Sequence, residues 1–329
     1  MSKLIVVIGV TGTQGSSVAN TFLELPGWRV RGTTRNPQSD SAKAMAARGV
    51  EVVQADYNDA ATLPAALEGA SVVFCNTDFF VNMMSAQPDA LPAGVGSVNE
   101  QAYHFEVAQN VAVAEAAARV PHLERFVLSS LSHASRWSRG EITSLWHYDS
   151  KAEALRIIGE RFPELAAKVS TVQIGHYVEN MHAFPGMMPQ RQADGSYAVL
   201  RPLGPDVPVP FVVAGRDTGA FVRALVDAPA GTDLLGASEV MTWEQWAAVW
   251  GRVNGVKAGF RRVENEELFR GAPKPLADEL WDAHAYFEKF GHTGGDPNVV
   301  TPEQLGITES LTTMEEYIRG EDWSSVLKA

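Results

Sequence analysis

Three glycines near the start of the chain have the spacing that suits phosphate binding. Gly9, Gly12 and Gly15 directly follow the apolar run 4–8 and precede a predicted helix. In such a strand–turn–helix the first glycine permits a sharp turn, the second lets the backbone approach a pyrophosphate, and the third lets the helix pack on the strand. The unpaired N–H groups of the helix N-terminus then attract a negative charge. The sequence therefore predicts a dinucleotide site, with a turn made of Gly9, Val10, Thr11, Gly12, Thr13, Gln14 and Gly15.

The residues after the second predicted strand indicate which dinucleotide binds. An NAD-specific site usually has a carboxylate there, which binds the ribose 2′-hydroxyl. This chain has Arg35 and Asn36 instead, and no acid before Asp40. A guanidinium can hold a 2′-phosphate through two parallel hydrogen bonds, although Arg35 could also be a solvated surface residue. We expect the cofactor to be NADP.

Polar and aromatic residues also follow the third and fourth predicted strands. Asp56 and Tyr57 are expected to contact the adenine, and Asp56 could also form a turn into the next helix. Thr77, Asp78 and Phe79 end the fourth strand, where the chain is expected to pass the ribose and pyrophosphate. Both groups therefore extend the predicted dinucleotide site.

Alternating strands and helices in the first half must position these residues. Strands are predicted at 4–8, 29–34, 51–55, 71–75, 125–128 and 169–174, with helices after the glycine turn and at 39–48, 59–67, 100–119 and 143–160. This βαβ alternation is typical of a parallel sheet with helices on both faces. We expect an α/β fold, a Rossmann-type doubly wound parallel sheet that binds its ligand at the carboxyl ends of its strands.

The pattern changes in the second half, where proline and glycine crowd residues 184–210. Further helices are predicted at 218–226, 242–250, 275–290 and 310–319, the last starting at Ser310 with Thr312 and Thr313 as alternative caps. We expect a dinucleotide domain at 1–175 and a smaller C-terminal α/β lobe at 176–329. That lobe would cover the open edge of the cofactor site, and some of its strands or helices could return to the first domain.

Composition excludes several classes of protein. The 329 residues include 27 basic and 39 acidic ones, which give a net charge of −12. This charge disfavours binding to a nucleic-acid backbone and suits a small-molecule enzyme or a basic protein partner. No apolar run approaches the ~20 residues that span a bilayer, and the N-terminus lacks the features of a secretory signal. We expect no direct nucleic-acid partner and no membrane partner, and the oligomeric state stays open.

Cysteine and histidine usage bears on compartment and metals. Cys75 is the only cysteine, so no internal disulfide can form and the fold does not depend on an oxidising compartment. The eight histidines lack the spacing of a metal site. We expect a cytoplasmic protein, also nuclear if it is regulatory, that holds no metal.

Taken together, these motifs resemble the NmrA-like family, whose members are atypical relatives of the short-chain dehydrogenases/reductases. The likeness lies in the glycine turn, in 34–37 and 52–56, and in 147–151, 177–180, 207–210 and 217–219. It implies an NADP-preferring Rossmann domain. It also implies that the dinucleotide is lined by the turn through Gln14 and by Arg35, Asp56, Thr77, Phe79, Lys151, Tyr177, Val178, Glu179 and Asn180.

The source of a proton for reduction is open at this point. Ordinary short-chain reductases carry a tyrosine four residues before a lysine. Here His147 stands four residues before Lys151, and Tyr148 is one residue, or about 100° of helix rotation, out of register. His147, Lys151 or Tyr177 could replace the tyrosine, because histidine exchanges protons near neutral pH and burial can favour a neutral lysine. Their structural alternatives are a helix-face residue, a ribose clamp and a pocket wall.

Substrate contacts are predicted more loosely. Ser129 closes the fifth strand, where a hydroxyl could polarise a carbonyl, contact the cofactor or make a turn. Flexible and aromatic side chains could line an apolar pocket or fill the core. They are Met83, Met84, Met181, Met187, Met188, Phe80, Trp137, Trp146, His176 and Phe184.

Two functions follow from these expectations. The first is an NADP(H)-dependent oxidoreductase of the NmrA-like type that acts on a small hydrophobic or aromatic carbonyl or enone compound. The second is a non-catalytic NADP(H)-binding redox sensor that binds a regulatory protein partner, since some members of the family act in that way.

Overall fold

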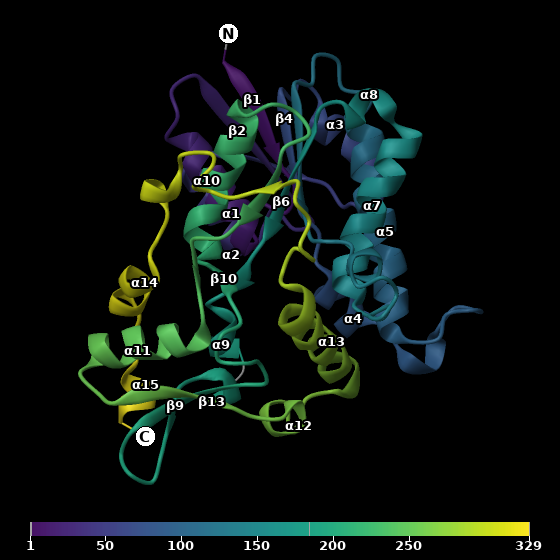
Figure 1. Ribbon diagram of the computed structural model, residues 1–329. Helices are drawn as coiled ribbons and strands as arrows, with labels where there is room; N and C mark the ends of the chain where they lie inside the picture. Colours follow the sequence, from purple (N-terminus) through teal and green to yellow (C-terminus); the bar gives the residue numbers. More distant parts are fainter. Residues whose placement is uncertain (1, 184, 329) are drawn as a thin grey trace.

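An eight-stranded parallel sheet organises the molecule in a computed structural model that describes residues 2–183 and 185–328 (Figure 1). Its strand order is β14-β11-β6-β5-β4-β1-β2-β3. The strands are β1 (Lys3–Val7), β2 (Trp28–Thr34), β3 (Glu51–Gln54), β4 (Val72–Cys75), β5 (Arg125–Ser130), β6 (Val169–Ile174), β11 (Asp233–Gly236) and β14 (Val299–Val300). The predicted doubly wound α/β fold is confirmed. The strand order reverses between β1 and β4, which is where such sheets bind ligands.

Helices cover both faces of this sheet because the buried side chains of β1 alternate between them. Ile5 and Val7 pack with α1 (Thr13–Leu23), α2 (Asp40–Ala47) and α10 (Ala214–Asp227). Leu4, Val6 and Ile8 pack with α3 (Leu63–Leu67), α5 (Val98–Ala117) and α7 (Trp146–Arg161) on the other face. Figure 1 shows the pair α1 and α10 on one side of the sheet and the pair α5 and α7 on the other. The carboxyl ends of the strands stay uncovered by these helices.

Two small sheets and several helices of the second half lie beyond those carboxyl ends. One sheet has the order β12-β10-β7 and the other β13-β9-β8. Figure 1 shows β9, β13 and α11 at the end of the molecule away from the N-terminus. These strands are β7 (His176–Tyr177), β8 (Gln190–Arg191), β9 (Tyr197–Arg201), β10 (Val209–Val212), β12 (Glu239–Met241) and β13 (Ala258–Arg262). The helices are α9 (Asn180–Ala183), α11 (Trp243–Asn254), α12 (Asn265–Leu268), α13 (Lys274–Phe290), α14 (Met314–Gly320) and α15 (Ser324–Leu327).

The second half has its own core and also returns to the large sheet. Its buried side chains include Trp243, Trp246, Trp250 and Trp323, which pack edge to face. Such aromatic clusters add roughly 0.5–1.5 kcal/mol per pair beyond their area burial. Strands β11 and β14 leave this half and extend the large sheet past β6. The two halves of the chain therefore share one sheet.

Several element boundaries differ from the prediction, each for a local reason. Residues 59–67 form a 3₁₀ turn, Ala60–Thr62, before α3, because Asp59 caps that turn. The last predicted helix starts at Met314 and not at Ser310, because Thr313 and Glu316 form a reciprocal capping box. Several short helices were not predicted: α4 (Phe79–Ser85), α6 (Ala134–Trp137) and α8 (Pro163–Ala166) in the first half, and α9, α12 and α15 in the second.

Candidate active site

The glycine turn after β1 has the geometry that phosphate binding needs. Gly9 has a φ of +71°, and a Cβ on Gly15 would lie 2.3 Å from the carbonyl oxygen of Gly9. A Cβ on Gly32 of β2 would lie 2.5 Å from the side chain of Val10, so the neighbouring strand also makes room for the turn. Gly12 caps α1 without a side-chain hydrogen bond, and no acid occupies the first helical turn. The N–H groups of this helix end therefore remain available to an anion.

Arg35 lies beside this turn on the loop after β2. Asn36 shapes the loop, because its Oδ1 accepts from the backbone N of Gln38 at 3.0 Å. Gln54 fixes the backbone by donating to the carbonyl oxygen of Arg35 at 3.2 Å. Arg35 is exposed, and its guanidinium pairs with no acid among the described residues. Burial raises the pKa of Tyr57 and the charge of Arg35 opposes this, which places the two side chains near each other.

The acids after β3 and β4, Asp56 and Asp78, form hydrogen bonds with the backbone close to them in the chain. Asp56 accepts from the backbone N of Asn58 at 2.9 Å, so the turn alternative holds for this residue. Asp78 caps α4 by accepting from the backbone N of Val81 at 3.1 Å. Phe79 is 1% exposed and lies in an apolar cluster. A dinucleotide could therefore meet Phe79 only through its backbone.

Lys151 lies in a buried polar network that sequence reasoning did not find. Its Nζ forms an ion pair with Glu106 of α5, whose side chain is completely buried. Glu106 also accepts from Ser150 Oγ and, at 2.8 Å, from Thr77 Oγ1. Asn110 donates to the same Thr77 oxygen at 2.9 Å. The network ties α7 to the end of β4 and fixes the position of the ammonium group.

His147 lies one helical turn before Lys151 and is also held by a buried acid. Its Nδ1 lies 2.7 Å from Oε1 of Glu279, and its backbone N donates to the same oxygen at 2.8 Å. Glu279 is buried on α13 and accepts from Asn99 at 2.8 Å. The His147 side chain is 14% exposed, and its Nε2 has no hydrogen-bond partner in the part of the chain described. This arrangement orients an imidazole with one nitrogen left to exchange a proton.

The two tyrosines near these residues are poorly suited to release a proton. Tyr148 is buried, and its hydroxyl lies 2.8 Å from Nδ1 of His292. Tyr177 receives a hydrogen bond of 2.6 Å from Nε2 of Gln14, which links β7 to the glycine turn. Burial raises the pKa of both hydroxyls well above the ordinary tyrosine value. Of the predicted donors His147 and Tyr177, His147 is therefore the one that keeps a ring nitrogen without a partner among the described residues.

The remaining predicted contacts differ in accessibility. Ser129 and Val178 are fully buried, and the hydroxyl of Ser129 has no partner among the residues described. Glu179 is half-buried, burial raises its pKa, and its Oε1 accepts from the backbone N of Gly215 at 3.5 Å. Asn180 is exposed at the start of α9. Glu179 and Asn180 are thus the accessible side chains of this segment.

The methionines predicted to line a pocket are divided between core and surface. Met83, Met181 and Met187 are buried in apolar clusters, whereas Met84 is 65% exposed. Core filling, the alternative interpretation, therefore holds for the buried three. Phe184 lies outside the described residues.

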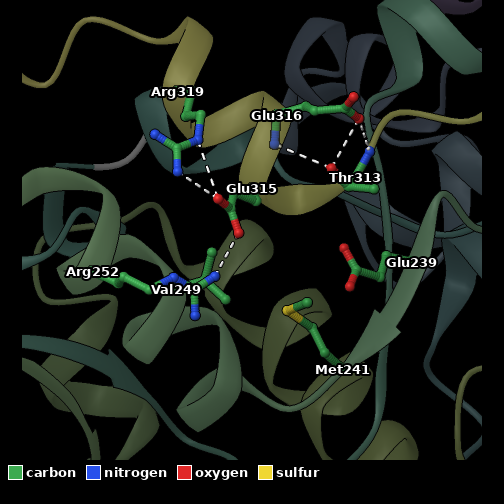
Figure 2. A pocket seen from close by; sticks show the side chains of 8 residues that line it. All are labelled: Glu239, Met241, Val249, Arg252, Thr313, Glu315, Glu316 and Arg319. Atoms are coloured by element: carbon green, nitrogen blue, oxygen red, sulfur yellow. Dashed lines mark hydrogen bonds and ion pairs between the residues drawn. The ribbon is translucent and has the colours of Figure 1, made fainter.

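Figure 2 shows a pocket of ≈ 350 Å³ on the surface between α11, β12 and α14. Its charged side chains already pair with one another or with the backbone. Glu315 pairs with Arg252 at 2.5 Å and with Arg319 at 2.6 Å, and Glu316 accepts from the backbone N of Thr313 at 2.9 Å. This pocket carries no group poised for chemistry.

The described residues contain neither a membrane-spanning helix nor a metal-binding cluster. None of their helices is long and apolar enough to cross a membrane. No group of three or more histidine, cysteine or acidic residues in this part of the chain could hold a metal ion.

Comparison with known proteins relates this arrangement to one family. The family model described as the NmrA-like family matches residues 1–318. The oxidoreductase hkm9 of Aspergillus hancockii, which contains an NmrA-like family domain, is 29% identical over 89% of this chain and 84% of its own. A similar oxidoreductase, cpsB of Aspergillus campestris, is 25% identical over 97% of this chain and 89% of its own.

Solved structures show the same fold. NmrA, a negative transcriptional regulator crystallised with NADP, matches with a TM-score of 0.76 and 22% identity over 97% of this chain and 95% of its own. An NADPH-dependent quinone oxidoreductase of Escherichia coli, crystallised with NADPH, matches with a TM-score of 0.66 and 22% identity over 95% of this chain and 98% of its own.

Proposed function

Because this chain belongs to the NmrA-like family, we propose that it is an NADP(H)-dependent oxidoreductase of small hydrophobic or aromatic carbonyl or enone compounds. Its fungal relatives carry the name oxidoreductase, and two structural neighbours were crystallised with NADP or NADPH. Residues 176–329 would cover the site as a substrate lobe. We also propose a cytoplasmic location. Burial raises the pKa of the single thiol, Cys75, to about 12, and this suits a cysteine that stays reduced.

The residues at the sheet edge fit NADP. The uncapped N-terminus of α1 offers N–H groups to the pyrophosphate, and Gly12 places no side chain in their way. Arg35 offers an unpaired guanidinium to the 2′-phosphate, and Tyr57 lies beside it. Lys151, held by Glu106, would bind the ribose, and Glu179 and Asn180 would line the nicotinamide end. When bound, the cofactor supplies the hydride.

The pairing of His147 with Glu279 carries the proposal that the protein is catalytic. Glu279 stabilises the imidazole when both of its nitrogens are protonated, because it accepts from Nδ1. Nε2 then donates a proton to the substrate oxygen as that oxygen gains negative charge. Partial exposure of the ring lets solvent return the proton. A positioned general acid of this kind contributes about 10²–10⁴-fold in rate.

A non-catalytic redox sensor is the second candidate. It is favoured by the absence of a tyrosine at position 147 and by the net charge of −12, which suits a basic protein partner. The structural neighbour NmrA is named a transcriptional regulator.

One assay separates the two candidates. Purified protein is mixed with NADPH and a panel of ketones, enones and quinones, and loss of the nicotinamide absorbance is followed. Oxidation of NADPH by at least one compound, lost in the variant His147→Phe, supports the enzyme. Tight NADPH binding without oxidation by any compound contradicts it and favours the sensor.

A further inference from the structure

Arg201, the last residue of β9, is buried without a counter-ion. Its side chain is 1% exposed, and its guanidinium carbon lies 3.8 Å from the centre of the Trp243 ring. Nη1 donates to the carbonyl oxygen of Leu200 at 2.6 Å, but Nε and Nη2 have no partner in the described residues. Burial of an unpaired charge is unfavourable, and an anion that pairs with the guanidinium would offset this cost.

Two histidines from other elements, His176 and His284, lie close enough to this guanidinium to be affected by its charge, and His292 lies near His176. His176 of β7 packs edge to face on the same Trp243 ring, with centroids 5.5 Å apart. His284 of α13 stacks on Phe269 and lies 3.1 Å from Oδ1 of Asn265. His292 follows α13 and bonds Tyr148 through Nδ1. Nε2 of His176 is buried and unpartnered among the residues described, whereas the ring of His292 also lies within reach of the backbone of Ile174 and Gln173.

The charges and the burial of these groups change their pKa values. Burial lowers the pKa of His176 and of His284 to about 3, and the charge of Arg201 is the next cause for both. Burial lowers the pKa of His292 to about 4 and that of Arg201 to about 9. At neutral pH the cluster therefore holds one positive charge and three neutral imidazoles, and no described carboxylate pairs with the guanidinium.

We propose that Arg201, with His176 and His284 beside it, binds the carboxylate of a hydrophobic organic acid, which is the substrate of the proposed reductase. This identification of the substrate class rests on the proposed function. The guanidinium fork matches a carboxylate with two parallel hydrogen bonds, and the neutral imidazole of His176 can donate from Nε2, which lacks a partner among the described residues. A monoanion balances the single positive charge, whereas a phosphate dianion exceeds it. The aromatic side chains around the cluster, Trp243, Phe211 and Phe269, are buried, so the body of the acid would lie among apolar rings.

The cluster is connected to the proposed proton donor. His147 packs on Tyr148 with ring centroids 4.9 Å apart, and Tyr148 packs on His292 at 5.7 Å. The charge of His147 also contributes to the lowered pKa of His292. Recognition of a carboxylate at one end of the substrate would thus be combined with proton delivery at the other.

Matched acids and esters test the proposal on the full chain with NADPH present. Calorimetry compares benzoate, phenylacetate, 3-phenylpropionate and benzoylformate with their methyl esters. We expect at least one acid to bind ten-fold or more tightly than its ester. If no acid of the set exceeds its ester, the carboxylate site is wrong.

Variants then assign the binding to Arg201. Arg201→Met should lose at least ten-fold in acid affinity, retain ester affinity and unfold at the same or a higher temperature, because it removes a buried unpaired charge. Arg261→Met, on the adjacent β13, is the control, since Arg261 is exposed and paired with Glu267. A folded Arg201→Met that keeps its acid affinity would show that Arg201 does not bind the carboxylate.

A fluorescence measurement on folded proteins covers the case in which Arg201→Met does not fold. Acid binding beside the Trp243 ring should change the tryptophan emission in the wild type and in Trp281→Phe, and not in Trp243→Phe. An unchanged response in Trp243→Phe would place the acid elsewhere. Tighter binding of acids than of esters, without NADPH oxidation, would overturn the proposed reductase and retain the carboxylate site. NADPH oxidation without tighter binding of acids would overturn the carboxylate site and retain the reductase.

Discussion

His147 and Glu279 stand 132 residues apart in the chain, yet two hydrogen bonds from His147 end on one oxygen of Glu279. The backbone N–H fixes the start of α7 and the imidazole Nδ1 fixes the ring. A single buried carboxylate of the second half thus positions both the backbone and the side chain of the proposed acid.

Glu279→Gln tests this positioning role. The amide keeps the size of the side chain but removes the charge that stabilises a doubly protonated imidazole. We expect kcat for NADPH oxidation to fall by roughly 10²-fold with NADPH affinity unchanged. Asp278→Asn is the control, because Asp278 forms its ion pair with the exposed Lys274. Equal kcat values for the two variants would remove Glu279 from the mechanism.

Arg35→Ala tests the cofactor preference. Loss of a charge-assisted pair with the 2′-phosphate should weaken NADPH binding by ~1–3 kcal/mol and leave NADH binding almost unchanged. Binding of both nucleotides is measured by calorimetry, with Arg48→Ala of the same surface as the control. An equal loss for NADPH and NADH would show that the 2′-phosphate lies elsewhere.

Gly15→Ala tests the close approach of α1 to the glycine turn. The added Cβ would lie 2.3 Å from the carbonyl oxygen of Gly9, so the helix must shift away from the turn. We expect a loss of ~1–3 kcal/mol in the free energy of unfolding and weaker NADPH binding. Gly159→Ala in α7 has no atom within 4 Å of the added Cβ and should be neutral or stabilising. Similar effects of both variants would contradict the close packing.

Acid should destabilise the fold through its buried histidines. Burial lowers the pKa of His284 to about 3 in the folded protein. The pKa of a histidine in an unfolded chain is about 6.5. Between these values the unfolded chain binds a proton that the folded chain does not. The stabilising contribution is therefore complete above about pH 6.5 and falls by up to about 1.4 kcal/mol per pH unit below it.

Urea unfolding of the wild type and of His284→Asn at pH 7.5 and 5.5 measures this contribution. The comparison between variants is needed because burial raises the pKa of Asp217 and Asp233, and these acids act in the opposite direction. The variant should lose less stability between the two pH values than the wild type. Equal losses would mean that His284 is not buried in its neutral form.

Features that depend on residues close together in the chain could be predicted from the sequence. The glycine turn, the absence of an acid after β2 and the alternating β1 all depend on residues within a few positions of one another, and they led to the fold and to the cofactor site. Asn99, Glu106 and Asn110 share one face of α5 with buried apolar residues, and this misplaced polarity is a signal that could have revealed the Lys151 network.

Long-range partners could not be predicted in the same way. Glu279 lies in a helix that also carries Asp278 and Asp282, and the local sequence does not mark which acid is fully buried and which two are partly exposed. Arg201 likewise looks like an ordinary strand-end residue until the fold buries it and brings His176 of β7 and His284 of α13 near it. Such pairings depend on how the second half folds back over the sheet.

Calorimetric titration of NADPH into the purified wild-type protein tests the central claim most directly. We expect saturable binding of one NADPH per chain, tighter than that of NADH. The absence of measurable heat with NADPH and with NADP on folded protein would contradict the dinucleotide site, and with it the proposed reductase.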